Sequence, residues 1–216
     1  MKDMCVDTFE YESLCANVAE RLQHICSQLQ GFDSSRLQQE GSLVSFASII
    51  FRYCRLLFDI KQRQRVLSRF IANRAITRRI KDFQEELDHF IDMLGLARNG
   101  TSWKELWNKD LSQLQSNFRD LLRSDDVLAD GCDNNEVKNE TAVLLQYELG
   151  LCIGDGEQAV RESIDGVLAQ FLHACAIDAP VVPKWFISRD DVQFYSWNIV
   201  RLERWTKFYE GKWRNS

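Results

Sequence analysis

The sequence predicts an all-α protein: an up-and-down bundle of four to six helices, followed by a short strand-rich C-terminal tail. Apolar residues recur at steps of three and four along most of the 216 positions, which is the spacing of one helical face. Both prolines, Pro180 and Pro183, lie near the C-terminus, so no proline ring interrupts the helices before them. Hydrophobic residues make up 45% of the chain and charged residues 27%, which is typical of a globular protein.

The first two predicted helices cover about 8–30 and about 42–60. Asp7 and Glu10 have the spacing of a capping pair at the start of the first helix, and Gly31 is typical of a helix end. The second helix has six apolar residues on one face, namely Leu43, Phe46, Ile50, Tyr53, Leu57 and Ile60. A one-sided stripe of this kind indicates a helix that packs against other helices.

The third and fourth predicted helices are joined by a short linker at 95–101. The third is the best defined, because its apolar residues alternate steps of four and three from Ile76 to Leu94. The fourth, about 103–122, begins with a capping box formed by Ser102 and Glu105. A linker of this length makes the two helices antiparallel neighbours.

Two further helices and the tail complete the chain. We expect the acidic, asparagine-rich stretch at 124–140 to be a solvated loop, with helices near 136–150 and 156–177 after it. The two prolines mark a boundary, and the short aromatic and β-branched runs beyond it indicate strands. The predicted parts are a four-helix bundle at 1–122, the acidic loop with two helices at 123–177, and the tail at 178–216.

Charge is spread unevenly along the chain. Net charge is −5, but between positions 52 and 81 ten basic residues accompany a single acid, Asp59, so this segment carries +9 and the rest −14. Such asymmetry points to an anionic partner or to docking on the chain's own acidic surface. The candidate contact residues for an anion, a lipid or a partner are Arg63, Arg65, Arg69, Arg74, Arg78 and Lys81.

Three interpretations of this basic segment stay open. We favour a solvated face whose cations pair with acids of the following helix, such as Asp82, Glu85, Glu86 and Asp88. An anionic membrane or protein partner ranks second, because Arg74, Arg78 and Lys81 share one helical face. Nucleic acid ranks last, since the isoelectric point is near 5.3 and no aromatic residues interleave with the basic ones.

No catalytic site, metal site or cofactor is predicted. Glu85 and His89 share a helical face, but a matching second half-site is absent. Seven cysteines occur without a Cys-x-x-Cys pair, so we expect most of them to be reduced core residues. The acids near the start argue against a secretory signal, and no apolar run approaches the roughly 20 residues that span a bilayer. We therefore expect a cytoplasmic protein.

The tail resembles the opening of tyrosine-kinase-like protein kinases, especially the expanded oomycete families. The resemblance covers the run from Val181 to Phe194, with its Trp-Phe-Ile at 185–187, and the run Phe-Tyr-Glu-Gly-Lys-Trp at 208–213. The kinase-like remnant residues are Trp185, Trp205, Tyr209, Gly211 and Trp213. This resemblance implies a truncated and degenerate start of a kinase N-lobe at 178–216.

The glycine-rich loop of those kinases would fall on Arg201, Glu203 and Thr206, with Trp205 in the place of the aromatic residue at the loop tip. None of the three is glycine, and the side chains would hinder the closure of backbone amides on phosphates. The third-strand lysine, the catalytic loop and the magnesium-binding aspartate are also missing from the sequence. The resemblance therefore implies a fragment that does not transfer phosphate.

The helical part, from Leu43 to Asp110, is similar to the helical domain that precedes such kinases. The resemblance rests on Phe51-Arg-Tyr-Cys-Arg-Leu-Leu-Phe and on Ile80-Lys-Asp-Phe-Gln-Glu-Glu-Leu-Asp-His-Phe-Ile. That domain belongs with the N-terminal four-helix bundles of the Cbl adaptors and of mixed-lineage kinase domain-like protein. It implies partner docking, self-association and, in the pore-forming relatives, contact with anionic lipid.

We therefore expect a non-catalytic signalling adaptor or regulatory helical module, associated with tyrosine-kinase-like kinases, that binds a protein partner or itself. Two alternatives stay open. One is the N-terminal fragment of a serine/threonine protein kinase, truncated by the gene model. The other is a helical bundle that binds anionic lipid at the periphery of a membrane.

Overall fold

A computed structural model describes residues 9–31, 42–98, 100, 102–124, 127–128, 134–153, 158–203 and 206–213, and from residue 193 onward it describes the backbone alone. The chain divides into two compact units, Met1–Asp130 and Gly131–Ser216. Seven α-helices account for most of the described residues, which confirms the predicted all-α class. The division after Asp130 falls inside the predicted middle part, 123–177, and the predicted boundary before 178 stays a prediction.

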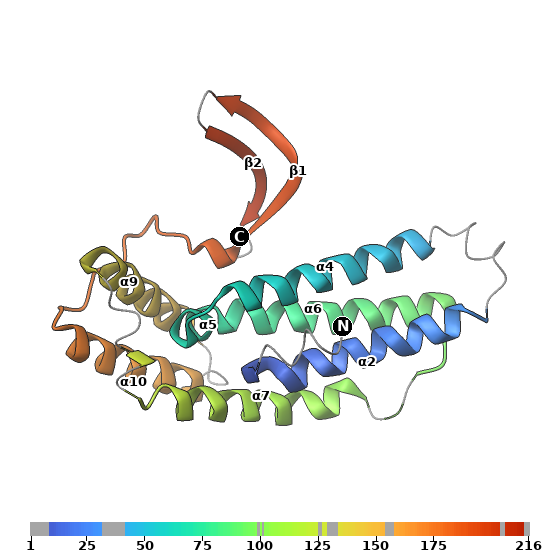
Figure 1. The fold of residues 1–216 in the computed structure, drawn as a ribbon, viewed down its shortest axis with the longest axis horizontal. Coiled ribbons are helices and arrows are strands. Elements are labelled where there is room, and N and C mark those ends of the chain that lie inside the picture. Colours follow the sequence, from blue (N-terminus) through green and yellow to red (C-terminus); the bar gives the residue numbers. More distant parts are fainter. Residues whose placement is uncertain are drawn as a thin grey trace. The chain divides into compact units, whose positions relative to one another are not determined.

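The first unit is built from four long helices that lie side by side and alternate in direction (Figure 1). A short helical turn precedes the first of them, and one short helix joins the second to the third. In chain order these elements are η1 (Phe9–Tyr11), α2 (Glu12–Leu29), α4 (Ser42–Gln62), α5 (Val66–Ile71), α6 (Asn73–Leu94) and α7 (Trp103–Leu121).

The core of this unit is formed by the apolar faces of α2, α4 and α6. Every residue of the predicted stripe from Ile76 to Leu94 on α6 is buried, because a stripe with this spacing lies along a single helical face. Aromatic rings cross between the helices: Phe46 of α4 stacks on Phe90 of α6, and the ring of Tyr53 meets that of Phe83 edge-on. The hydroxyl of Tyr53 also donates to the Cys15 carbonyl at 2.6 Å, which ties α4 to α2.

The predicted inward face of α4 is wrong at two of its six positions. Leu43 is exposed and Ile50 is half-buried, while Ile49 and Leu56, which were not predicted, are buried. The physical reason is that α4 has apolar residues around most of its circumference, so periodicity does not say which side faces inward. Tertiary packing decides it, and it leaves apolar side chains facing outward.

Helix α5 was not predicted, and α6 begins before the first residue of its predicted apolar stripe, Ile76. No helix was predicted between about 60 and the stripe that starts at Ile76, but Val66–Ile71 form a helix, and α6 begins at Asn73. Gly95 ends α6 with a left-handed φ of 62°, and the amide of Leu96 donates to the Ile91 carbonyl at 2.9 Å. This is the usual glycine-based end of a helix.

The second unit consists of two helices, an ordered segment and a β-hairpin. Its elements are α9 (Asn135–Leu151), α10 (Gln158–Cys175), η3 (Arg189–Asp191), β1 (Val192–Glu203) and β2 (Thr206–Trp213). The predicted loop at 124–140 ends early, because the Asn134 side chain caps α9 by accepting from the Val137 amide at 2.8 Å. The strands pair antiparallel, from Val192 with Trp213 to Glu203 with Thr206.

Most of the cysteines that the structure describes are reduced, as expected. Cys15, Cys26, Cys54 and Cys152 are free thiols, but Cys175 at the end of α10 is disulfide-bonded. Spacing along the sequence gives no signal for this bond, because it does not show which cysteines meet in space.

Candidate functional site

Helix α4 carries a second apolar face that is left exposed. Val44, Phe51 and Phe58 are 76%, 56% and 53% exposed, Ala47 is exposed and Cys54 is half-buried. We call these five residues the α4 stripe. They follow one another at alternating steps of three and four, which is the spacing of a coiled-coil seam.

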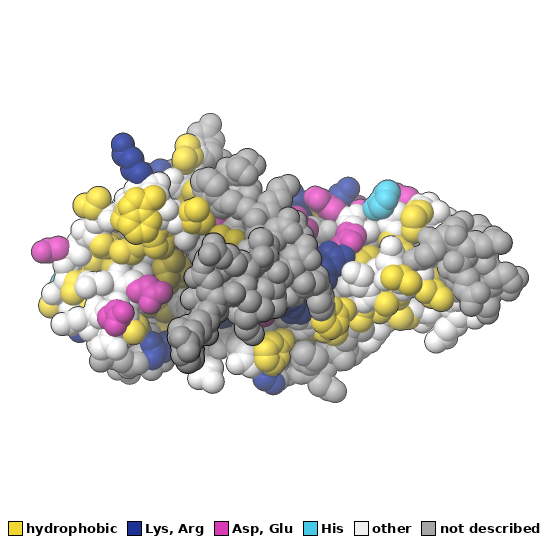
Figure 2. Space-filling model, turned by 90° about the horizontal axis from the view of Figure 1, so that it is seen from above, with side chains coloured by type: hydrophobic (Ala, Val, Ile, Leu, Met, Phe, Trp, Pro, Cys, Tyr) yellow, Lys and Arg dark blue, Asp and Glu magenta, His cyan; other side chains and the backbone are white. Residues whose placement is uncertain are grey.

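The α4 stripe is continuous with other apolar surface on the same helix. Leu43 is exposed beside Val44, and Ile50 is half-buried beside Phe51. The view from above, onto the side of the first unit that α4 forms, shows hydrophobic side chains gathered there (Figure 2). Single exposed hydrophobic residues are common, but a contiguous patch is typical of an interaction site. Sequence reasoning missed this stripe, although the seven-residue spacing of Val44, Phe51 and Phe58 was there to find.

Arg69, one of the predicted contact residues, points into the protein. Its guanidinium binds both carboxylate oxygens of Glu10 at 2.6–3.1 Å and donates to the carbonyls of Arg63 and Gln64 at 2.6 and 2.9 Å. Glu10 is only 4% exposed, and the Tyr11 hydroxyl donates to the Arg69 carbonyl at 2.9 Å. Arg69 therefore fastens α5 and the segment after α4 to the start of the first helix.

The other five predicted contact residues lie on two segments. Arg63 and Arg65 are in the connection between α4 and α5, and Arg74, Arg78 and Lys81 are on α6. Lys81 lies 3.8 Å from Glu85 in an exposed pair. Arg63, Arg65 and Arg74 each take part in a noncovalent interaction of their own. The sequence places all six near one another along the chain, but the structure does not give them equal access to a ligand.

Further cations of the basic segment are also paired. Arg52 of α4 lies 2.5 Å from Glu86 of α6, and Arg79 of α6 lies 3.3 Å from Asp59 of α4. These pairs join neighbouring helices and neutralise part of the segment's charge. The Arg52–Glu86 pair is of the kind that the favoured interpretation expects, whereas Asp59 belongs to the basic segment itself.

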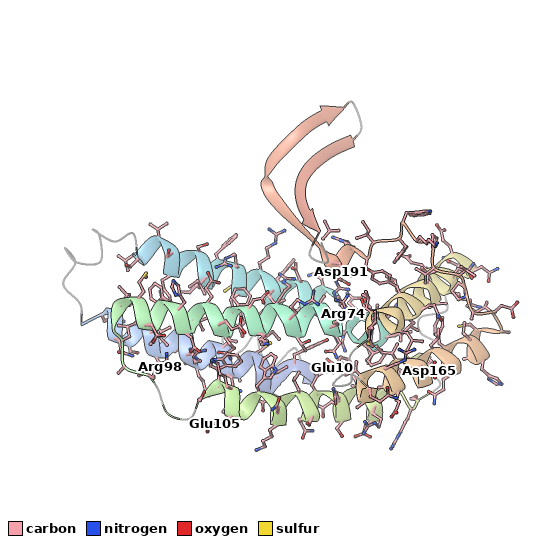
Figure 3. All side chains as sticks on the ribbon, turned by 180° about the vertical axis from the view of Figure 1, so that it is seen from behind. Glu10, Arg74, Arg98, Glu105, Asp165 and Asp191 are labelled. Atoms are coloured by element: carbon pink, nitrogen blue, oxygen red, sulfur yellow. The ribbon has the colours of Figure 1, made fainter. Side chains whose placement is uncertain are left out.

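Asp88 is a half-buried acceptor rather than a solvent-facing carboxylate. Arg21 of α2 binds one of its oxygens at 2.5 Å, and the indole N–H of Trp103 donates to the other at 3.0 Å. Arg98 and Lys104 lie 3.9 and 3.8 Å away; Figure 3 labels Arg98 just beyond the end of α6. One carboxylate of α6 thus connects α2, α6 and α7, which is a structural role.

A small polar cavity lies between the start of α2 and the middle of α7. Its volume is about 230 Å³, and Glu10, Glu12 and Asp110 contribute carboxylates to its lining. Asp110 accepts a hydrogen bond from the Asn17 side chain at 2.6 Å. Partial burial raises the pKa of Asp110 above its usual range, although Lys109 and this hydrogen bond oppose the effect. Three acids without a positioned nucleophile define no reaction.

The segment after α10 is held against α9. The ring of Phe186 meets that of Tyr147 edge-on at 5.2 Å, and the Tyr147 hydroxyl donates to the buried Asp191 carboxylate at 3.0 Å. Trp185, the first of the kinase-like remnant residues, is exposed.

Of the remaining kinase-like residues, Tyr209, Gly211 and Trp213 lie in strand β2. Trp205 lies outside the described residues. In β2 the backbones of Tyr209, Gly211 and Trp213 pair with Ile199, Phe194 and Val192. Glu203 pairs with Thr206 at the end of the two strands. These are two of the three positions at which the kinase resemblance would place glycines.

Among the residues that the structure describes, no group of His, Cys, Asp and Glu is arranged to hold a metal ion. In the same part of the chain, every helix is too short or too polar to cross a bilayer. Comparisons with protein families, with curated proteins and with solved structures find no match to this chain.

Arg69→Met should lower the free energy of unfolding by about 3 kcal/mol, because it leaves the buried Glu10 carboxylate without a counter-charge. Lys81→Met is the matched control, since Lys81 forms only an exposed pair, and it should change stability by no more than about 0.5 kcal/mol. Urea unfolding followed by circular dichroism measures both. Equal effects of the two substitutions would show that Arg69 is an ordinary surface cation.

Asp110→Asn should change how stability depends on pH. Because the folded-state pKa of Asp110 is raised, its contribution to stability is present below its usual pKa of about 4 and is lost as pH rises through the folded-state pKa. The unfolding free energy of the wild type relative to the variant should therefore fall as the pH rises above about 4. Asp120→Asn removes an exposed carboxylate from the same helix and is the control. A difference that rises with pH would contradict the prediction.

Proposed function

We propose that this chain is a non-catalytic helical adaptor that binds a protein partner through the α4 stripe. The observation that carries the proposal is a seam of exposed apolar residues on a helix whose opposite face already lies in a complete core. Val44, Phe51 and Phe58 are each more than half exposed, so covering their exposed apolar surface would stabilise a complex. Exposed aromatic side chains are also frequent anchors of protein interfaces.

The geometry of the stripe favours a helical partner. From Val44 to Phe58 the seam spans about 21 Å, at 1.5 Å per residue, and it follows one side of a straight helix. A second helix with the same three-and-four spacing would place its side chains between those of α4. A flat or extended partner would reach fewer of the five residues.

The resemblance to tyrosine-kinase-like kinases is the basis for proposing that the module acts in signalling. With Arg201, Glu203 and Thr206 at the positions of the loop glycines, we propose that the module acts beside a kinase rather than as one. The alternative is that the chain is the front of a serine/threonine kinase. A transcript that continues into a third-strand lysine and a catalytic loop would favour that alternative.

The partner can be trapped with a photoreactive phenylalanine analogue placed at Phe51 and, as a control, at the exposed Glu20 of α2. We expect discrete covalent adducts from position 51 in native cell extract, absent from position 20 and lost when Phe58→Glu is added. Mass spectrometry identifies the bound protein. Equal adducts from both positions would contradict docking through the stripe.

A second candidate function is binding to anionic lipid. The observation that favours it is the row formed by Arg74, Arg78 and Lys81 along α6, which presents positive charge at i, i+4 and i+7. Basic clusters of this kind attract anionic head groups and release them at high salt. This function would use α6, whereas the adaptor function uses α4.

If lipid binding is the function, the protein should co-sediment with phosphoinositide-containing vesicles in low salt and much less in high salt. The triple variant Arg74→Glu, Arg78→Glu, Lys81→Glu should lose this binding. Its matched control, Lys109→Glu, Arg119→Glu, Arg123→Glu, makes the same charge change at exposed positions on and just after α7 and should lose much less. Equal sedimentation with neutral and anionic vesicles would reject the lipid function.

A further inference from the structure

We propose that the occupant of the α4 stripe is a second copy of this chain, whose α4 lies antiparallel to the first. This inference rests on the proposed docking function of the stripe and names the partner. It follows from the sizes and the charges of the residues along α4.

The sizes of the seam residues alternate. One set, at seven-residue intervals, consists of Val44, Phe51 and Phe58, and the other consists of the small residues Ala47 and Cys54. When two such helices run antiparallel, each of the two phenylalanines can face a small residue of the second set. Phe51 then lies opposite Cys54 of the second copy, and Phe58 lies opposite Ala47.

This arrangement repeats itself across a two-fold axis located between Arg52 and Tyr53. It therefore gives four contact layers, each with one phenylalanine and one small residue. Large residues facing small ones fill a seam without gaps. A two-fold interface of this kind also closes on itself, so association stops at the dimer.

A parallel pair of α4 helices would fit poorly. It would bring phenylalanine against phenylalanine at positions 51 and 58 and leave Ala47 facing Ala47, so crowded layers would alternate with hollow ones. Crowding and cavities each reduce the stability of a packed interface. The sizes of the side chains thus select the direction of the second helix.

Charge along α4 selects the same direction. From Ser42 to Phe51 the helix has no ionisable residue, whereas its second half carries Arg52, Arg55 and Lys61 with a single acid, Asp59. A parallel pair would bring the two basic halves together, and their like charges would repel. In the antiparallel pair, each basic half lies beside an uncharged half, and Arg55 lies near Ser48 of the second copy.

The contact involves one helix from each copy, so it is smaller than a standard protein interface. We expect a dissociation constant on the order of 10 µM. Between about 1 and about 200 µM, the mean mass in sedimentation velocity should therefore rise from 25.2 kDa towards twice that value.

Phe51→Glu should keep the full-length protein monomeric over the whole concentration range. Met93→Glu places the same charge at an exposed apolar residue of α6 and should leave dimerisation unchanged. Far-ultraviolet circular dichroism and the melting temperature should show that both variants are folded. A wild type that stays monomeric throughout would overturn the second-copy proposal, and so would equal loss of dimer in both variants.

The direction of the helices is tested by oxidative cross-linking of the full-length Phe51→Cys variant, followed by peptide mapping. The antiparallel register predicts a disulfide between position 51 of one copy and Cys54 of the other. Links that join position 51 to position 51, or Cys54 to Cys54, would indicate a parallel pair and overturn the proposal. If the wild type is monomeric but the photoreactive probe at position 51 captures a different protein, docking through the stripe stands and the second copy is rejected.

Discussion

The contact between Glu10 and Arg69 fixes the corner of the bundle on which the exposure of α4 depends. Arg69 holds the carbonyls of Arg63 and Gln64, which directly follow α4, and it joins them to a carboxylate at the start of the first helix. This anchoring holds the end of α4, while the buried face of the helix, which includes Phe46, Ile49 and Tyr53, sets its rotation about its own axis. Once that rotation is set, Val44, Phe51 and Phe58 face outward.

The contact between Glu10 and Arg69 is one of several ion pairs that involve cations of the basic segment. A cluster of ten cations along the sequence suggests a surface for an anionic ligand, but four of them are committed to carboxylates of the bundle through the pairs Arg52–Glu86, Arg69–Glu10, Arg79–Asp59 and Lys81–Glu85. Three of these pairs join different elements of the bundle, so part of the positive charge serves to join helices. The side chains of Val44, Phe51 and Phe58 are more than half exposed, and this exposed apolar surface carries the proposed function.

The proposed adaptor function and the proposed dimer both depend on the exposed apolar seam of α4. An exposed apolar seam gains free energy whenever it is covered, so it attracts any helix with matching spacing. Two features favour a partner helix that runs in the opposite direction. Phenylalanine alternates with alanine and cysteine along the seam, and the charge of α4 is concentrated in its second half. A copy of α4 itself meets this requirement.

The sequence by itself determined the all-α class, the approximate extents of the long helices and the inward face of α6, because a helix with a single apolar stripe can bury only that stripe. It did not determine the inward face of α4, which is apolar on most sides, nor helix α5, nor the internal role of Arg69. The tertiary structure decided these features, because they depend on which residues distant in the chain come into contact. Glu10 and Arg69 are 59 positions apart, and no local pattern records their pairing.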